Sequence, residues 1–253
     1  LTVLHKLNWG IICSMALGAG AFFLLYSELF NFRYIAWLMN IGGDPYQSYI
    51  GWELFRSSQW SFPLGRIINL GYPVGIPITF TDSIPLLSIF FKLFRYWLPF
   101  PFQFIGLWIF ICFTLQGMFG YLLLEQYFKQ RALAVIGSIF FILSPIMMFR
   151  LEGHFSLGAH WLLLWSLWLV LKSTGTIRIW HWTTITVLSV LVHPYLIFMC
   201  GALFTVDVIR RVWLIRTLTL KKGLYLLIAE IVIVLILSYS IGIFSVGHST
   251  APG

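Results

Sequence analysis

The sequence is dominated by long runs of apolar residues, the first of which extends from about residue 7 to residue 29. A helix needs about 20 consecutive apolar residues to cross the hydrocarbon core of a bilayer, and this run is long enough. Hydrophobic residues make up 60% of the 253 residues and charged residues only 9%, whereas about a quarter of a soluble domain is charged. These features predict an all-α, polytopic membrane protein.

Six further apolar runs follow, so we predict about seven transmembrane helices. The later spans are expected at about 103–124, 132–149, 157–172, 179–193, 195–209 and 223–244. The two short spans on either side of Pro194 are expected to form a hairpin that turns at His193-Pro194-Tyr195, because proline disfavours helical backbone in the residue before it. A single tilted helix broken at Pro194 is the competing interpretation.

The basic residues predict the orientation of the chain in the membrane. With the N-terminus in the cytoplasm, the inner loops hold 10 of the 16 Lys and Arg residues, namely Lys6, Lys129, Arg131, Lys172, Arg178, Arg210, Arg211, Arg216, Lys221 and Lys222. The short outer loops then hold only Arg150. Because Lys and Arg accumulate in cytoplasmic loops, we expect a protein of the cytoplasmic (inner) membrane with its N-terminus inside. The same bias explains the net charge of +8 without a nucleic-acid partner.

The first two spans are separated by a long segment, residues 31–102, which this topology places outside the cell. Asp44 is a suitable N-cap and Pro45 a suitable first helical residue, and Gln47 would complete a capping box. A helix is therefore expected to continue to about Ser58, and the helical spacing of its aromatic residues predicts an amphipathic helix on the membrane surface.

The rest of this external segment is expected to be less regular. Residues 61–85 are rich in Gly and Pro, which predicts an irregular loop. Residues 84–97 are apolar but carry Lys92 and Arg95, and they are closed by prolines at 99 and 101. We expect them to form a second interfacial or re-entrant helix rather than a full span.

This order of elements resembles the N-terminal module of the GT-C glycosyltransferases. Asp44 follows the first span, where that family keeps its catalytic carboxylate. The stretch Thr81-Asp82-Ser83-Ile84-Pro85-Leu86-Leu87 and Phe90-Phe91-Lys92-Leu93-Phe94 resembles the segment that leads from the family's external loop into the membrane. Residues 123–131 (LLEQYFKQR) resemble its next cytoplasmic turn, and Ser144-Pro145 through Arg150-Leu151-Glu152-Gly153-His154 resemble the return to the outer face.

The resemblance implies a membrane glycosyltransferase that moves a sugar from a polyprenyl-phosphate donor to an acceptor at the outer face. The whole chain, residues 1–253, would then be one such module and the N-terminal part of a longer protein. The expected partners are the lipid bilayer and the lipid-linked sugar donor. The sequence has no Asp-x-Asp pair, so no residue pattern indicates a divalent metal, and no other cofactor is implied.

Two aspartates are the candidate catalytic residues. Asp44 is expected to act as the general base that takes a proton from the acceptor hydroxyl as it attacks the anomeric carbon. A purely structural role as helix cap is the alternative reading of Asp44. Asp82 precedes Ser83 and Pro85 at an expected helix start, so capping is again the alternative to a role as second carboxylate facing Asp44.

Five further residues are candidates for substrate binding. Arg150, Glu152 and His154 cluster in one outer loop, where cations would offset the charge of the leaving phosphate. His193 lies at an outer turn, on the same side as Asp44, and Arg66 lies in the Pro- and Gly-rich loop. The structural alternatives are an internal Arg–Glu pair in the outer loop and a purely structural histidine at a helix end.

Two other classes of function are compatible with a polytopic chain. A lipid or saccharide transporter or flippase would need polar residues in mid-span, inverted repeats and broken helices, and the sequence offers few mid-span polar residues. A non-catalytic membrane assembly subunit is the third reading. The sequence names neither the sugar, the acceptor nor a protein partner.

Overall fold

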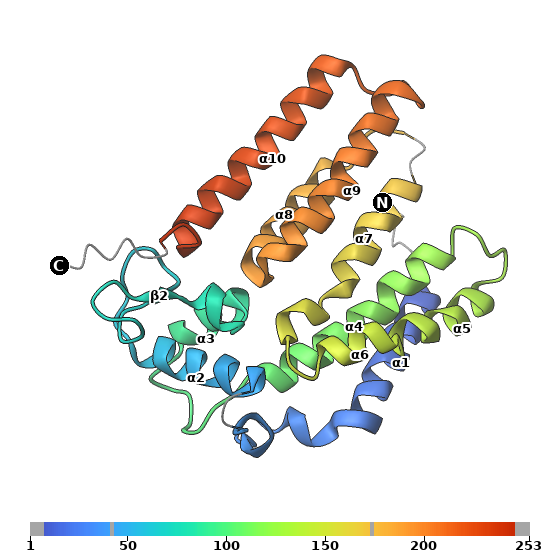
Figure 1. The fold of residues 1–253 in the computed structure, drawn as a ribbon. Coiled ribbons are helices and arrows are strands. Elements are labelled where there is room, and N and C mark those ends of the chain that lie inside the picture. The colour runs from blue at the N-terminus through green and yellow to red at the C-terminus, as the bar shows by residue number, and fades with distance from the viewer. Residues whose placement is uncertain (1–7, 41–42, 173–174, 246–253) are drawn as a thin grey trace, which may run out of the picture.

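The computed structural model describes residues 8–40, 43–172 and 175–245. Nearly all of its regular structure is helical (Figure 1). The α-helices are α1 (Trp9–Tyr26), α2 (Asp44–Ser57), α3 (Pro85–Leu93), α4 (Ile105–Leu124), α5 (Arg131–Ile142), α6 (Pro145–Arg150), α7 (His160–Leu171), α8 (Ile179–Val192), α9 (Pro194–Trp213) and α10 (Leu220–Ile241). Short 3-10 turns are η1 (Ser27–Phe30), η2 (Ala36–Leu38), η3 (Ile78–Thr81) and η4 (Phe155–Gly158), and two antiparallel strands are β1 (Arg66–Ile67) and β2 (Ile76–Pro77).

Four helical segments are long and apolar enough to cross a membrane. They are Trp9–Phe30, Ile105–Leu124, Arg131–Arg150 and Leu220–Ile241. Two further apolar helices, Phe155–Leu171 and Ile179–Val192, are shorter than a bilayer requires. Helix α9 has 20 residues but carries Asp207 and two arginines. The all-α prediction and several candidate spans are confirmed, whereas a total of seven spans stays a prediction.

Helices α1 and α4 pack closely because glycine lines their contact. A Cβ atom on Gly18 of α1 would lie 2.2 Å from the carbonyl oxygen of Phe113 in α4, so only glycine permits this approach. At one end of the pair, Asn8 Nδ2 donates to Glu125 Oε1 over 2.8 Å. The two helices are therefore antiparallel neighbours, with the start of α1 beside the end of α4.

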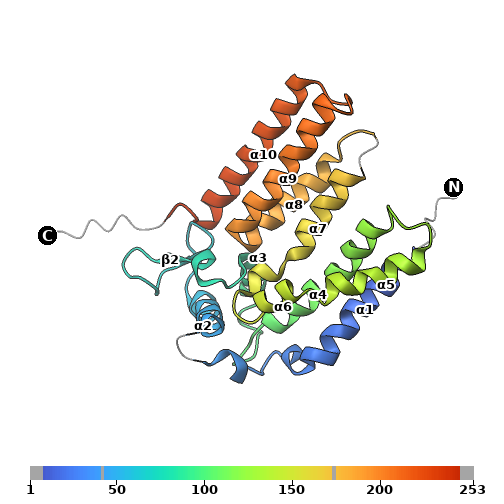
Figure 2. The same cartoon turned by 45° about the vertical axis from the view of Figure 1, so that its right-hand side comes forward.

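Helices α8 and α9 form the expected hairpin rather than one broken helix. They lie side by side in both views (Figures 1 and 2). The indole nitrogen of Trp182 donates to Asp207 Oδ2 over 3.0 Å although the residues are 25 positions apart. His193 between the helices has extended backbone, with φ −160° and ψ 137°. Helix α10 packs against both members of the hairpin.

The segment between α1 and α4 folds against one end of the helices, where the α8–α9 hairpin turns. Gln103 Nε2 donates to the carbonyl oxygens of Leu29 and Asn31 at 2.9 Å each, which ties the two ends of the segment together. The backbone N–H of Leu64 donates to the Ser240 carbonyl near the end of α10 over 2.8 Å. Figure 1 shows α2, α3 and β2 gathered at this end.

The helix expected at 45–58 is confirmed as α2, but its expected cap is wrong. Gly43 is the N-cap residue, Asp44 is the first helical residue, and no side chain caps the helix start. Gln47 instead donates through Nε2 to the Phe80 carbonyl over 3.0 Å. The segment expected to be irregular contains only the two-residue strands and η3, and the helix expected over 84–97 shortens to α3.

Candidate functional site

A cavity of about 310 Å³ lies where the segment between α1 and α4 meets the other helices. Its lining residues among those that the structure describes are Asp44, Gln47, Thr79, Phe80, Asp82, His154, His193, Pro194 and Tyr195. They come from four segments: the start of α2, the η3 turn, the loop before η4, and the α8–α9 turn. Four of the seven residues expected to form the site, two aspartates and two histidines, are thus brought together.

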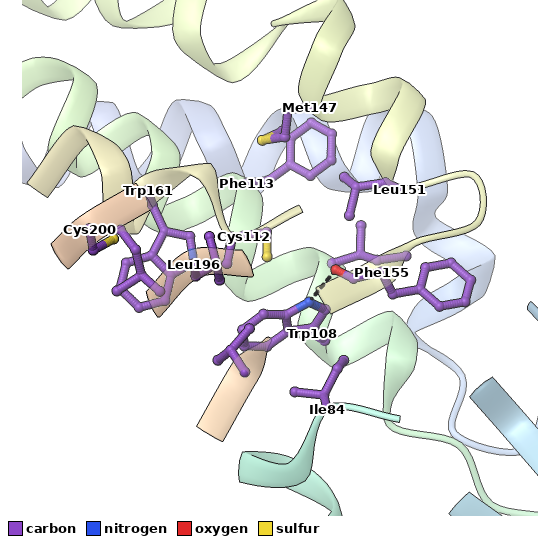
Figure 3. Packing of buried hydrophobic residues seen from close by; sticks show 14 of the residues in the cluster. Ile84, Trp108, Cys112, Phe113, Met147, Leu151, Phe155, Trp161, Leu196 and Cys200 are labelled. Carbon is purple, nitrogen blue, oxygen red and sulfur yellow. Dashed lines mark hydrogen bonds between the residues drawn. The ribbon is translucent and has the colours of Figure 1, made fainter. Parts of the chain in front are cut away.

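A shared apolar core explains why these segments meet. Ile84, Phe155 and Leu196 are each no more than 1% exposed, and each follows a cavity residue within three positions. Figure 3 shows these three side chains packed around Trp108 of α4. The Trp108 indole nitrogen also donates to the Phe155 carbonyl over 2.7 Å. Burial of apolar neighbours therefore fixes the chain on which Asp82, His154 and His193 stand.

Asp44 stands at the open side of the cavity. Its carboxylate is about half-exposed, and Oδ2 lies 3.6 Å from His154 Nε2. Gly153 packs beside it, since a Cβ atom there would lie 3.3 Å from the same oxygen. Because this carboxylate is half-exposed and caps no helix, a ligand can reach it.

Asp82 stands on strained backbone at the inner side. It has φ 54°, and Ile84 has φ 49°, a left-handed conformation that is rare for a β-branched residue. Two such residues, one on each side of Ser83, cost about 1–3 kcal/mol each and tend to occur at functional sites. Neither expected capping role is found, since Asp82 ends η3 and the N-cap residue of α3 is Ile84.

Hydrogen bonds to α2 hold this strained turn. Ser83 Oγ donates to the Ser48 carbonyl over 2.7 Å, and Thr81 Oγ1 lies 2.7 Å from Ser83 Oγ. The turn approaches α2 at Gly51, where a Cβ atom would lie 2.3 Å from Thr81 Oγ1. Glycine at this position therefore sets the distance between the segments that carry Asp44 and Asp82.

The two carboxyl groups have different surroundings. Asp82 Oδ1 accepts a hydrogen bond from Ser156 Oγ, while Oδ2 is buried and has no hydrogen-bond partner. Burial raises the pKa of Asp82 to about 6, and the negative charge of Asp44 adds to this effect. The Ser156 hydrogen bond and His154 act in the opposite direction. Asp82 thus binds a proton far more readily than an ordinary aspartate.

His193 is held uncharged at the turn between α8 and α9. Its Nδ1 accepts the backbone N–H of Tyr195 over 3.1 Å. Burial lowers the pKa of His193, nearby His154 acts in the same direction, and together they bring it to about 4. With Nδ1 occupied as an acceptor, the neutral ring carries its proton on Nε2, which makes His193 a hydrogen-bond donor rather than a cation.

The other three expected binding residues do not line the cavity. Arg66 lies in β1, and its Nη2 donates to the Pro73 carbonyl over 3.4 Å. Arg150 is the last residue of α6, and Glu152 is exposed on the following turn. Their proposed contact with substrate stays a prediction.

Several cavity residues escaped the sequence analysis. Gln47 was expected in a capping box, and Thr79, Phe80 and Tyr195 carry no recognisable motif. Ser156 was missed because a serine in an irregular loop gives no signal of its own. Its proximity to His154 was the one available indication. Ser156 does not line the cavity but donates to Asp82, and the other residues line it; all are brought there by tertiary packing.

The arrangement provides an accessible carboxylate, a histidine beside it, a buried carboxyl group and a neutral histidine. Such a set can take a proton from a hydroxyl group and donate hydrogen bonds to an oxygen-rich ligand. Across the described residues, no cluster of three or more His, Cys, Asp or Glu side chains is arranged to hold a metal ion.

The fold and the site together define an all-α protein with several helices able to cross a membrane and a polar, carboxylate-bearing cavity at one end of them. The chain belongs to the family described as "Domain of unknown function (DUF6311)", whose model matches residues 15–253. No curated protein and no solved structure shows a significant match to the chain.

Proposed function

We propose that this protein is a membrane glycosyltransferase that moves a sugar from a polyprenyl-phosphate donor to an acceptor at the outer face of the cytoplasmic membrane. The observation that carries the proposal is the convergence of Asp44, Asp82, His154 and His193 on one cavity. These residues are far apart in the sequence, and two of them were chosen as catalytic candidates from a resemblance to the GT-C enzymes.

Asp44 is the general base in this proposal. It takes the proton from the acceptor hydroxyl while that oxygen forms a bond to the anomeric carbon of the sugar. The bond from that carbon to the phosphate oxygen breaks, and its electron pair stays on the polyprenyl phosphate. His154, with Nε2 at 3.6 Å from Asp44 Oδ2, orients the carboxylate and stabilises its charge. The half-exposed position of Asp44 leaves room for an acceptor to approach.

The position of the cavity suits a substrate with a lipid tail. It lies at the end of the apolar helices, beside the turn between α8 and α9, so a phosphate group could bind there while an apolar chain stays among the helices. In the seven-span arrangement that we propose, this end faces outward, because the opposite loops carry most of the basic residues.

The strain at Asp82 and Ile84 supports a functional reading. A protein retains two left-handed non-glycine residues only where the surrounding structure enforces them, and such residues concentrate at active sites. A purely structural turn at this place could use glycine or asparagine without that cost.

The experiment that tests the proposal compares the wild-type protein with two purified variants in lipid nanodiscs. Each is supplied with polyprenyl-phosphate sugars, and release of polyprenyl phosphate is measured. Asp44→Asn should reduce transfer by about 10²–10⁴-fold, because the amide cannot act as a base. Glu28→Gln is the control: it changes an exposed carboxylate in the η1 turn, directly after α1. It should leave transfer unchanged. Transfer by Asp44→Asn at the wild-type rate would show that the base is not Asp44.

A further inference from the structure

We infer that the aromatic rings of Tyr195 and Phe80 contact the sugar that is transferred from the donor, and that this sugar carries no acidic group. The inference rests on the proposed function for the identity of the reaction. It goes further than that function because it names residues that hold the sugar and the class of sugar that they accept.

Two large aromatic side chains are left uncovered at the cavity. Tyr195 is 63% exposed and Phe80 is 46% exposed, and both line the cavity. They come from separate segments, the start of α9 and the η3 turn. Single exposed aromatic residues are common on protein surfaces, but two that meet beside polar groups in one cavity provide an apolar surface that a ligand can cover.

Hydrogen bonds hold both residues in place before a ligand binds. The backbone N–H of Tyr195 donates to His193 Nδ1 over 3.1 Å, and the two rings pack edge to face with their centres 4.8 Å apart. The Phe80 carbonyl accepts from Gln47 Nε2 over 3.0 Å. A ligand therefore meets aromatic rings on a fixed backbone and loses little free energy in ordering them.

A pyranose ring offers the surface that this cavity can bind. Its C–H groups form apolar patches with a small positive charge, which the negative face of an aromatic ring attracts. Its hydroxyl groups need hydrogen-bond partners, and Gln47 has a second N–H and an amide oxygen for them, while neutral His193 has an N–H on Nε2. The volume of about 310 Å³ is near the lower limit of about 300–1,000 Å³ for ligand pockets, which suits one sugar ring.

The charges of the cavity select against an acidic sugar. No arginine or lysine is among the described residues that line it. His193 is uncharged at neutral pH, because burial lowers its pKa, and His154 is already engaged with Asp44 at 3.6 Å. The carboxylate of an acidic sugar would meet the negative charge of Asp44 without a fixed positive charge to offset it. A neutral sugar incurs no such cost.

The positions of the two sides of the cavity assign this sugar to the donor rather than to the acceptor. Tyr195 is the second residue of α9, and the exposed residues that follow it, Phe198 and Met199, are apolar, so a lipid-linked substrate approaches on this side. Asp44, the proposed base, stands at the half-exposed side, where the acceptor approaches. In a direct displacement the base acts on the opposite face of the sugar from the leaving group, so the phosphate points away from Asp44.

The test measures sugar binding in the absence of transfer. The probes are the methyl glycosides of glucose, mannose, galactose and N-acetylglucosamine, with methyl glucuronide as the acidic counterpart of methyl glucoside. Binding to the protein in nanodiscs is measured by saturation-transfer NMR. Tyr195→Ala removes the ring and Tyr195→Phe keeps it. Tyr72→Ala is the matched control, because Tyr72 is 84% exposed but does not line the cavity.

We expect at least one neutral glycoside to bind the wild-type protein, Tyr195→Phe and Tyr72→Ala with similar affinity. It should bind Tyr195→Ala about 10-fold more weakly, because the apolar contact with the ring is lost. Phe80→Ala should weaken binding in the same way, and it decides the matter through a separate segment if Tyr195→Ala does not fold. Methyl glucuronide should bind neither the wild-type protein nor the variants.

Three results would each overturn the inference. They are the absence of binding by every neutral glycoside, wild-type affinity in a folded Tyr195→Ala or Phe80→Ala variant, and binding of methyl glucuronide as tight as that of methyl glucoside. Wild-type affinity in both alanine variants would mean that the two rings only anchor the protein at the membrane interface.

Failure of this inference and failure of the proposed function give different results. If glycoside binding depends on Tyr195 and Phe80 while Asp44→Asn transfers sugar at the wild-type rate, the sugar site stands and the proposed base is wrong. If Asp44→Asn abolishes transfer while glycoside binding is insensitive to both rings, the proposed function stands and the assignment of the aromatic residues is wrong.

Discussion

Gly51→Ala should displace the segments that carry Asp44 and Asp82 from one another. The new Cβ atom would lie 2.3 Å from Thr81 Oγ1, 2.4 Å from Thr81 Cβ and 2.6 Å from Ser83 Oγ. Ordinary contact begins near 3.4 Å, so the η3 turn has to move away from α2 by about 1 Å. Neither neighbour can simply rotate aside, because both hydroxyl groups are hydrogen-bonded in the buried turn.

The expected cost follows from this overlap. Inserting a methyl group into a well-packed interior costs about 1–3 kcal/mol in the free energy of unfolding. The same movement shifts Asp82 relative to Asp44, and a misplacement of about 1 Å can lower a catalysed rate by about 10²-fold. Gly51→Ala should therefore reduce both thermal stability and sugar transfer.

Gly20→Ala is the matched control. Gly20 also lies within a helix, but a Cβ atom there would meet nothing within 4 Å. Thermal unfolding in nanodiscs, followed by tryptophan fluorescence, should rank Gly51→Ala below the wild-type protein and Gly20→Ala at or above it, because alanine is the better helix former. Equal stability of the two variants would refute the packing that we describe between α2 and the η3 turn.

Two further predictions concern a buried lysine and the topology. Lys92 Nζ lies 3.8 Å from the centre of the Phe55 ring and 3.1 Å from Ser58 Oγ, and burial lowers the pKa of Lys92 to about 8. In the unfolded chain the lysine pKa is near 10.5, so between about pH 8 and 10 the unfolded chain binds more protons than the folded protein, and the free energy of unfolding should rise with pH over this range. Lys92→Met should abolish this rise, and an unchanged rise in the variant would exclude Lys92 as its source. In a Cys13→Ala background, Phe62→Cys and Glu152→Cys should react with an impermeant thiol reagent added to intact cells. Gln130→Cys and Thr217→Cys should not react, and labelling at position 130 would contradict the seven-span topology.

Much of the architecture could be predicted from the sequence because it depends on local pattern. Apolar runs of sufficient length become helices wherever they occur, and prolines mark two helix starts: Pro45 is the second residue of α2 and Pro194 the first residue of α9. The turn at His193 was likewise predictable, because proline acts on the residue before it. The four candidate spans follow from length and composition alone.

The details of the site were less predictable because they depend on tertiary contacts. Asp44 and Gln47 fit the pattern of a capping box, yet Gly43 is the N-cap residue and Gln47 donates to the Phe80 carbonyl instead. The left-handed backbone at Ile84 opposes the preference of a β-branched residue, so only the packing of this turn on Gly51 and Ser48 produces it. The contact between Ser156 and Asp82 joins residues 74 positions apart.

The most direct test of the central claim is to locate the bound substrate. A polyprenyl phosphate that carries a photoreactive group on the atom next to the phosphate is irradiated with the purified protein in nanodiscs, and the labelled peptides are identified by mass spectrometry. Labelling should be confined to the segments around Asp44, Asp82, His154 and His193, and excess unlabelled polyprenyl phosphate should suppress it. Labelling that is found only elsewhere, such as at the cavity lined by Arg56 and Arg95, would contradict the assignment of this site.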